Sequence, residues 1–148
     1  MKQKNKREEK YDWMLSYQWT GIPDEIRQKN LEKILDFFEK NNQKIFCSDQ
    51  FQNFFDLNNM GSEENYNFCL EAQKRAEKVL FFIFAENEST GMKKELALAK
   101  KNKQKAILLL NQKYEDLDWV QEFKDFVEEI IYFDDFEKFD FGELKNFL

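Results

Sequence analysis

The sequence contains no histidine, and this absence removes several kinds of active site at once. Serine–histidine and cysteine–histidine nucleophile pairs are excluded, as is every metal site that needs an imidazole ligand. Only two cysteines are present, Cys47 and Cys69, which are too few and too far apart for a zinc site or a disulfide framework. Acid–base chemistry therefore falls to carboxylates, tyrosine, cysteine or lysine, and we expect neither a metal nor a cofactor.

An excess of positive charge is also lacking. Lys and Arg number 23 against 29 Asp and Glu, which gives a formal net charge of −6. A nucleic-acid polymer needs an excess of basic residues, so no such partner is expected, whereas the phosphates of a small nucleotide can be met by backbone N–H groups at a helix start. No apolar stretch approaches the length of a membrane span, and the few cysteines suit a reducing compartment. We expect no membrane partner and a cytoplasmic location.

Glycine and proline are rare, with four and one residues, which leaves little room for a loop-rich or disordered chain. The 148 residues include 42% hydrophobic residues and 17 phenylalanines, enough for one contiguous core. Residues 1–10 alternate Lys, Gln, Asn and Glu and are predicted to form a polar tail. The single folded domain is predicted to span residues 11–148.

Short apolar runs alternate with amphipathic segments along the whole chain, as in proteins built from βα units around a parallel sheet. The runs VLFFIF and AILLL are continuously apolar, as expected of strands covered by helices on both faces. We therefore predict a single α/β, Rossmann-like (flavodoxin-like) domain, with a five-stranded, mainly parallel sheet and helices on both faces. The predicted strands are Tyr11–Tyr17, Lys44–Cys47, Val79–Phe84, Ala106–Leu110 and Glu129–Phe133.

Helical spacing of apolar residues marks the segments between these strands. Pro23 suits the first turn of a helix that carries Leu31, Ile34 and Phe38 on one face. The other predicted helices are Glu63–Lys78, Met92–Lys103, Asp116–Phe126 and a short terminal piece around Phe136–Phe147. Two glycine-containing loops follow the first and third strands, where open α/β sheets bind their ligands.

The segment ENESTGMKKELALA, residues 86–99, follows the most apolar strand and opens a helix. Ser89 or Thr90 can cap this helix, and Gly91 lets the backbone come close to a ligand. Glu95 shares the apolar face of the helix, so it is predicted to turn toward the sheet. A carboxylate there either reaches solvent or a lysine, or it serves a ligand as nucleophile or electrostatic stabiliser, and its position favours the second interpretation.

The run from Ala76 to Leu110 resembles the nucleoside 2-deoxyribosyltransferase superfamily: an apolar strand, a Ser-x-Gly loop, a Glu-Leu-x-x-Ala helix and a second apolar strand. The segments YDWMLSYQWTG and IFCSD extend this similarity to about three quarters of the chain. The resemblance implies that Glu95 attacks the anomeric carbon of a nucleoside or nucleotide and forms a glycosyl-enzyme intermediate. It also implies a homo-oligomer, because such sites are often completed across a subunit interface.

The same resemblance assigns substrate contacts. Ser89 and Gly91 match the loop that holds the sugar 5′ end or a 5′-phosphate, and Met92 and Asp49 are added as further contacts. The first strand and its loop match the region that lines the base and sugar pocket, with the candidates Trp13, Tyr17, Trp19 and Gly21. Tyr17 and Trp19 are placed to stack on a base, although Trp19 capping the core is an equally supported interpretation.

One position departs from the family pattern. An acidic residue that protonates the leaving base is expected eight positions before Glu77, and this sequence has Cys69 there. Glu71, Asp49 and Glu86 are the alternative acids that the sequence offers.

Two other hypotheses stay open. YDWMLSY resembles the first strand of Toll/interleukin-receptor domains, whose catalytic members cleave the nicotinamide bond of NAD with a helical Glu; this resemblance is the weaker one, because Gly91-Met92 stand where those domains prefer Trp-Cys. The third hypothesis is a catalytically silent nucleotide-binding module, which Cys69 at the acid position favours.

Overall fold

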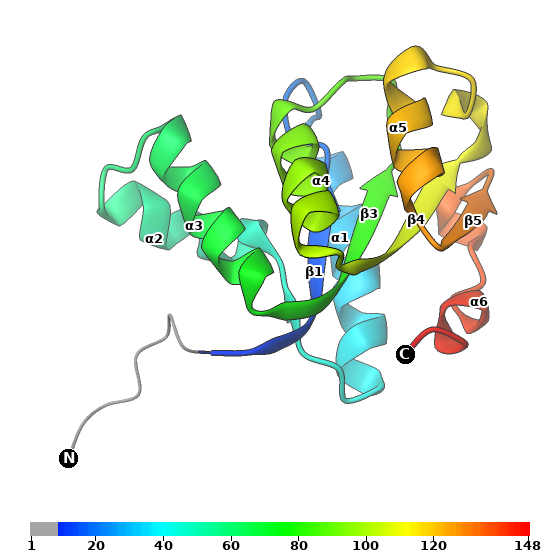
Figure 1. Ribbon diagram of the computed structural model, residues 1–148, viewed down its shortest axis with the longest axis horizontal. Coiled ribbons are helices and arrows are strands. Elements are labelled where there is room, and N and C mark those ends of the chain that lie inside the picture. Colours follow the sequence, from blue (N-terminus) through cyan, green and yellow to red (C-terminus); the bar gives the residue numbers. More distant parts are fainter. Residues whose placement is uncertain (1–8) are drawn as a thin grey trace.

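The computed structural model describes residues 9–148, which form one layer of parallel strands between two layers of helices (Figure 1). The strand order is β2-β1-β3-β4-β5, and all four pairings are parallel. The strands are β1 (Tyr11–Tyr17), β2 (Ile45–Phe46), β3 (Ala76–Ile83), β4 (Lys105–Asn111) and β5 (Glu129–Phe133). The predicted α/β class with five strands is confirmed. Residues 1–8 of the predicted polar tail lie outside the described residues, so that division of the chain stays a prediction.

The helices divide between the two faces of the sheet. Helix α1 (Asp24–Lys40) covers one face together with the C-terminal segment, which contains η4 (Phe136–Lys138) and α6 (Gly142–Lys145). The opposite face is covered by α3 (Ser62–Lys74), α4 (Thr90–Asn102) and α5 (Asp118–Phe126). The remaining elements are η2 (Ser48–Phe51), α2 (Gln52–Leu57) and η3 (Gln112–Tyr114). None of the helices in residues 9–148 combines the length and hydrophobicity needed to cross a bilayer.

Strand β3 shows why the apolar runs are continuous. Phe81 and Ile83 pack under α4 and α5, whereas Leu80 and Phe82 pack on the α1 side, and all four are fully buried. Successive side chains of a strand point to opposite faces, so a strand covered on both sides must be apolar at every position. The Phe-rich C-terminal segment docks on the same domain, where the ring centroids of Phe136 and Phe82 lie 4.9 Å apart.

Several predicted bounds differ from the observed ones by a few residues. Three further differences concern the helices α3 and α1 and the C-terminal segment. Helix α3 ends at Lys74 rather than Lys78, because Ala76 already pairs with Tyr11 in the sheet and the strand takes over. Pro23 immediately precedes α1 instead of lying in its first turn. The terminal piece is two short helices instead of one. In addition, η2 and α2 were not predicted, since their sequence has no clear apolar periodicity.

Candidate active site

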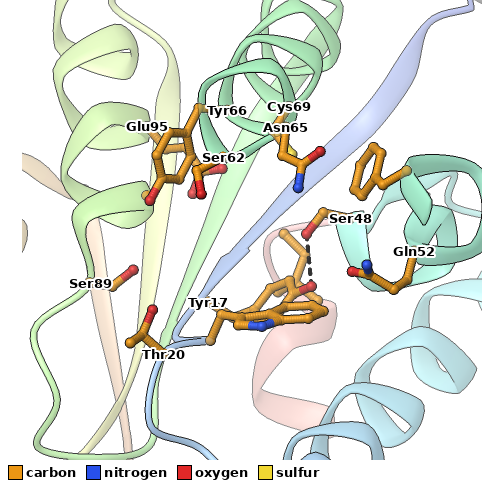
Figure 2. Close-up of a pocket in the computed structure, with 14 residues that line it drawn as sticks. Tyr17, Thr20, Ser48, Gln52, Ser62, Asn65, Tyr66, Cys69, Ser89 and Glu95 are labelled. Carbon is orange, nitrogen blue, oxygen red and sulfur yellow. Dashed lines mark hydrogen bonds between the residues drawn. The ribbon is translucent and has the colours of Figure 1, made fainter. Parts of the chain in front are cut away.

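A cavity of about 290 Å³ opens at the carboxyl ends of β1 and β3, where the strand order reverses direction (Figure 2). This switch point is where open α/β sheets bind their ligands, and the volume is at the lower end of ordinary small-molecule sites, about 300 Å³. The walls come from β1 and its loop, from η2 and α2, from α3, and from the start of α4. The lining residues are Leu15, Tyr17, Trp19, Thr20, Ser48, Gln52, Phe55, Ser62, Asn65, Tyr66, Cys69, Ser89, Gly91 and Glu95.

Glu95 lines this cavity from the second turn of α4. Its neighbours on the helix face, Met92 and Leu96, are buried in the core, so the carboxylate is carried to the sheet side as the spacing predicted. Ser16, near the end of β1, donates a hydrogen bond to Glu95 Oε1 at 2.6 Å. Burial raises the pKa of Glu95 to about 7, and the hydrogen bond from Ser16 opposes that rise. A carboxyl group that ionises near neutral pH inside a cavity is typical of catalytic sites.

The start of α4 is built by Ser89 and Gly91. Ser89 is the N-cap: it is buried, and its Oγ accepts a hydrogen bond from the backbone N–H of Met92 at 3.2 Å. A Cβ added at Gly91 would lie 3.3 Å from the ring of Tyr66, so the glycine allows α3 and α4 to approach closely. Ser89 and Gly91 both line the cavity, whereas Met92 is fully buried in the core and does not.

Tyr17 and Trp19 form an aromatic wall at the end of β1, with ring centroids 6.3 Å apart. The hydroxyl of Tyr17 hydrogen-bonds with Ser48 Oγ at 2.8 Å, and burial holds its pKa well above the ordinary value. Trp19 is half-buried and both lines the cavity and packs against the core, so the two interpretations of this residue are compatible. Trp13 points to the core instead, where its indole N–H donates to Gln43.

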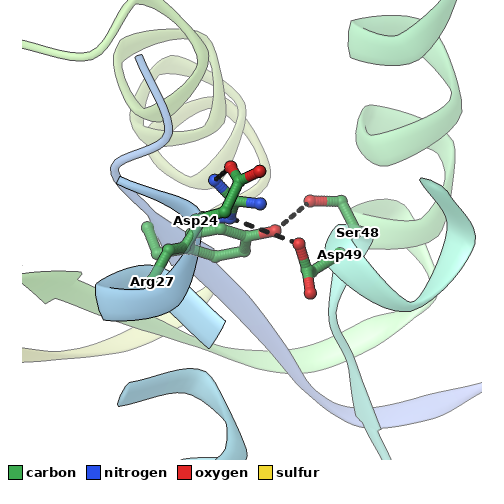
Figure 3. Close-up of polar contacts among 5 residues, drawn as sticks. Asp24, Arg27, Ser48 and Asp49 are labelled. Carbon is green, nitrogen blue, oxygen red and sulfur yellow. Dashed lines mark hydrogen bonds and ion pairs between the residues drawn. The ribbon is translucent and has the colours of Figure 1, made fainter. Parts of the chain in front are cut away.

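A buried arginine, which sequence reasoning missed, supports this wall from behind. The guanidinium of Arg27 lies 3.8 Å from the centroid of the Trp19 ring. It pairs with Asp24 at 2.8 Å and with Asp49 at 3.3 Å (Figure 3). Arg27 is only 3% exposed. The available signal was its position, four residues before Leu31 on the apolar face of α1. Asp49, predicted to contact substrate, is bound to Arg27 and does not line the cavity.

Gln18 is the second residue that the sequence did not reveal. Its side chain is fully buried and makes four hydrogen bonds to the loop after β3: the amide nitrogen donates to the carbonyls of Ala85 and Asn87, and the oxygen accepts from the N–H groups of Phe84 and Ala85. Gly21 has a φ of +80°, and a Cβ there would meet Asn87 at 2.5 Å. Gly21 therefore shapes the contact between the two loops and does not line the cavity.

Helix α3 presents a neutral face to the cavity, formed by Ser62, Asn65, Tyr66 and Cys69. Burial and the neighbouring Glu95 raise the pKa of the Cys69 thiol well above its ordinary value. Asn65 Oδ1 is buried and accepts no hydrogen bond from the described residues.

The alternative acids do not fill this position. Glu71 is exposed and pairs with Lys74, Glu86 is exposed, and Asp49 is held by Arg27; none of the three lines the cavity. Among residues 9–148, no three cysteine or acidic side chains gather as a metal site.

Comparisons with known proteins bear on this geometry. No protein-family model matches the chain, and no curated protein sequence matches it. Among solved structures, the CMP N-glycosidase BcmB of Clostridium botulinum matches over 91% of this chain and 99% of its own, with a TM-score of 0.65 and 18% sequence identity. The two chains share one fold. The architecture implied by the nucleoside 2-deoxyribosyltransferase resemblance is thereby confirmed, whereas the roles of individual residues stay predictions.

Proposed function

We propose that the protein cleaves or transfers the N-glycosidic bond of a nucleoside or nucleoside 5′-monophosphate, with Glu95 as the nucleophile. The observation that carries this proposal is the carboxylate of Glu95, which faces a cavity at the switch point of the sheet and is held there by Ser16. The fold shared with a CMP N-glycosidase supports it.

The chemistry resembles that of retaining glycosidases. Ser16 binds Oε1 of Glu95, so the second carboxylate oxygen can approach the anomeric carbon. As the bond to the base lengthens, positive charge develops on the sugar, and the adjacent carboxylate stabilises it before forming the glycosyl ester. Water or a second base then resolves this ester.

The other walls of the cavity suit the rest of the substrate. Tyr17 and Trp19 offer ring surfaces for a base, and base stacking on an aromatic side chain contributes about 1–3 kcal/mol. Ser89 and the free N–H groups at the start of α4 are suited to the sugar 5′ end or to a 5′-phosphate.

The test is to incubate the protein with ribonucleosides, deoxynucleosides and their 5′-monophosphates and to measure free base by chromatography. Base release by the wild type that falls at least about a thousandfold in Glu95→Gln is expected, because removing a nucleophile removes the covalent route. Glu32→Gln is the matched control, since Glu32 is an exposed glutamate on α1. Equal activity of Glu95→Gln and the control would refute the assignment.

Cys69 at the position of the leaving-group acid favours one second candidate, a nucleotide-binding module without catalysis. Ligand-induced thermal stabilisation without any product would identify it. The homo-oligomer and the cytoplasmic location remain predictions, which sedimentation and cell fractionation would test.

A further inference from the structure

The cavity has an unusual balance of charge. Among its described lining residues Glu95 is the one ionisable carboxyl group, and none is a lysine or an arginine. Of the basic side chains on neighbouring elements, Arg27 pairs with two aspartates behind Trp19 and Lys93 pairs with Glu88, while Lys94 holds its Nζ 5.2 Å from the centroid of the Tyr66 ring. The lining residues themselves therefore carry one negative charge when Glu95 is ionised, and this charge attracts a cationic group placed beside it.

The α3 face also determines how a leaving base can depart. When the bond from the anomeric carbon to a neutral base breaks, the electron pair stays on the base nitrogen, and the base needs a proton to leave as a neutral molecule. The α3 face supplies hydroxyl, amide and thiol groups, which are much weaker acids than a carboxyl group. Burial raises the pKa of both Cys69 and Tyr17 further, so these groups keep their protons.

A base that already carries a fixed positive charge avoids this requirement. We propose, on the basis of the function proposed above, that the preferred substrates are N-glycosides of cationic bases, such as N-alkylpyridinium or N7-alkylpurine nucleosides. The carboxylate of Glu95 forms a bond to the anomeric carbon while the carbon–nitrogen bond breaks. The electron pair of the broken carbon–nitrogen bond stays on the base and neutralises its positive charge. Water then attacks the same carbon, releases Glu95 as carboxylate and loses one proton to solvent.

The aromatic wall is consistent with such a base. Tyr17 and Trp19 both line the cavity, and aromatic rings attract cations; the Trp19 ring already carries the guanidinium of Arg27, which leaves Tyr17 as the ring without such a contact. The substrate cation and the Glu95 carboxylate also attract each other before the reaction begins.

The decisive experiment compares matched substrates that differ in this charge: 7-methylguanosine against guanosine, with nicotinamide riboside as a second cationic probe. Without a general acid, the ratio of kcat/KM between the matched pair should equal or exceed the ratio of their uncatalysed rates. A general acid would compress that ratio by about a hundredfold to ten-thousandfold. Such compression, with base release still dependent on Glu95, overturns the inference and leaves the proposed function standing. If base is released neither from the cationic nor from the neutral nucleosides, both the inference and the proposed function are overturned.

Binding gives a readout that needs no turnover. At pH 8 the wild type should bind 1-methylnicotinamide about tenfold more tightly than nicotinamide, and Glu95→Gln should lose this preference. Equal affinities in the wild type would contradict the inference.

A gain-of-function variant tests whether the cavity lacks a general acid for the leaving base. Cys69→Asp places a carboxyl group on the α3 face and should raise the ratio of kcat/KM for guanosine to kcat/KM for 7-methylguanosine by at least about tenfold. Since Cys69 is nearly buried, Asn65→Asp is the second variant: it is nearly isosteric, and Asn65 is only half-buried. If both variants fold, as shown by cooperative thermal unfolding, and neither favours guanosine, the inference is wrong.

Discussion

Replacing Glu95 by glutamine should stabilise the protein relative to the wild type, and this advantage should grow as the pH rises. Burial raises the pKa of Glu95 from 4.5 to about 7. Each pKa unit corresponds to about 1.4 kcal/mol, so the full shift is worth about 3 kcal/mol, and partial exposure to the cavity reduces this to about 2–3 kcal/mol. The folded state holds the Glu95 proton more tightly than the unfolded state, so this group lowers wild-type stability as pH rises from 4.5 to about 7.

The assay is urea unfolding of the wild type, Glu95→Gln and the control Glu32→Gln at several pH values between 5 and 8. The free energy of unfolding of Glu95→Gln should gain about 2 kcal/mol on the wild type between pH 5 and pH 8, because about a quarter of the effect already falls below pH 5. The control should keep a constant offset. Parallel pH profiles for Glu95→Gln and the wild type would show that Glu95 ionises as it does in water, which would contradict the raised pKa of this carboxyl group.

Three further predictions concern the groups around the cavity. Ser16→Ala removes the hydrogen bond that opposes the raised pKa of Glu95, so the midpoint of the pH–rate profile, where activity rises with pH, should move up by about one pH unit; an unchanged midpoint would contradict this. Gln18→Leu leaves four backbone groups without their partner and should lower the free energy of unfolding by about 3 kcal/mol, measured with denaturant; a loss below about 1 kcal/mol would be inconsistent with these bonds. Arg27→Met frees the Trp19 ring and should raise KM about tenfold with little change in kcat, accompanied by altered tryptophan fluorescence; a loss confined to kcat would argue against a positioning role.

Much of the fold was predictable because each strand has a plain local signal. The bounds of β1 and β5 agree with the predicted ranges, and the apolar runs Val79–Ile83 and Ala106–Leu110 form most of β3 and β4. The junction between α3 and β3 was not predictable, because residues 75–78 read equally well as helix, and it is pairing of Ala76 and Lys78 with β1 that selects the strand. Tertiary contacts thus override local preference at the boundaries.

For the candidate site, the sequence predicted the placement of Glu95, Ser89, Gly91, Tyr17 and Trp19, because helix spacing and strand ends fix where these residues lie. It did not predict the residues from η2, α2 and α3 that form the opposite wall, since these depend on how α3 packs beside α4. It also assigned Asp49 to substrate binding, whereas Asp49 accepts a hydrogen bond from Arg27, which lies 22 positions earlier in the chain.

The two ends of α3 contribute to different parts of the structure. Ser62, Asn65 and Tyr66 face the cavity and are exposed or half-buried, whereas Ala72 and Gln73, further along the helix, are fully buried in the interior. Exchanging the first three residues would therefore change the wall of the cavity at little expense to folding. Sequence divergence in that short stretch of helix can reshape the cavity while the rest of the scaffold stays unchanged.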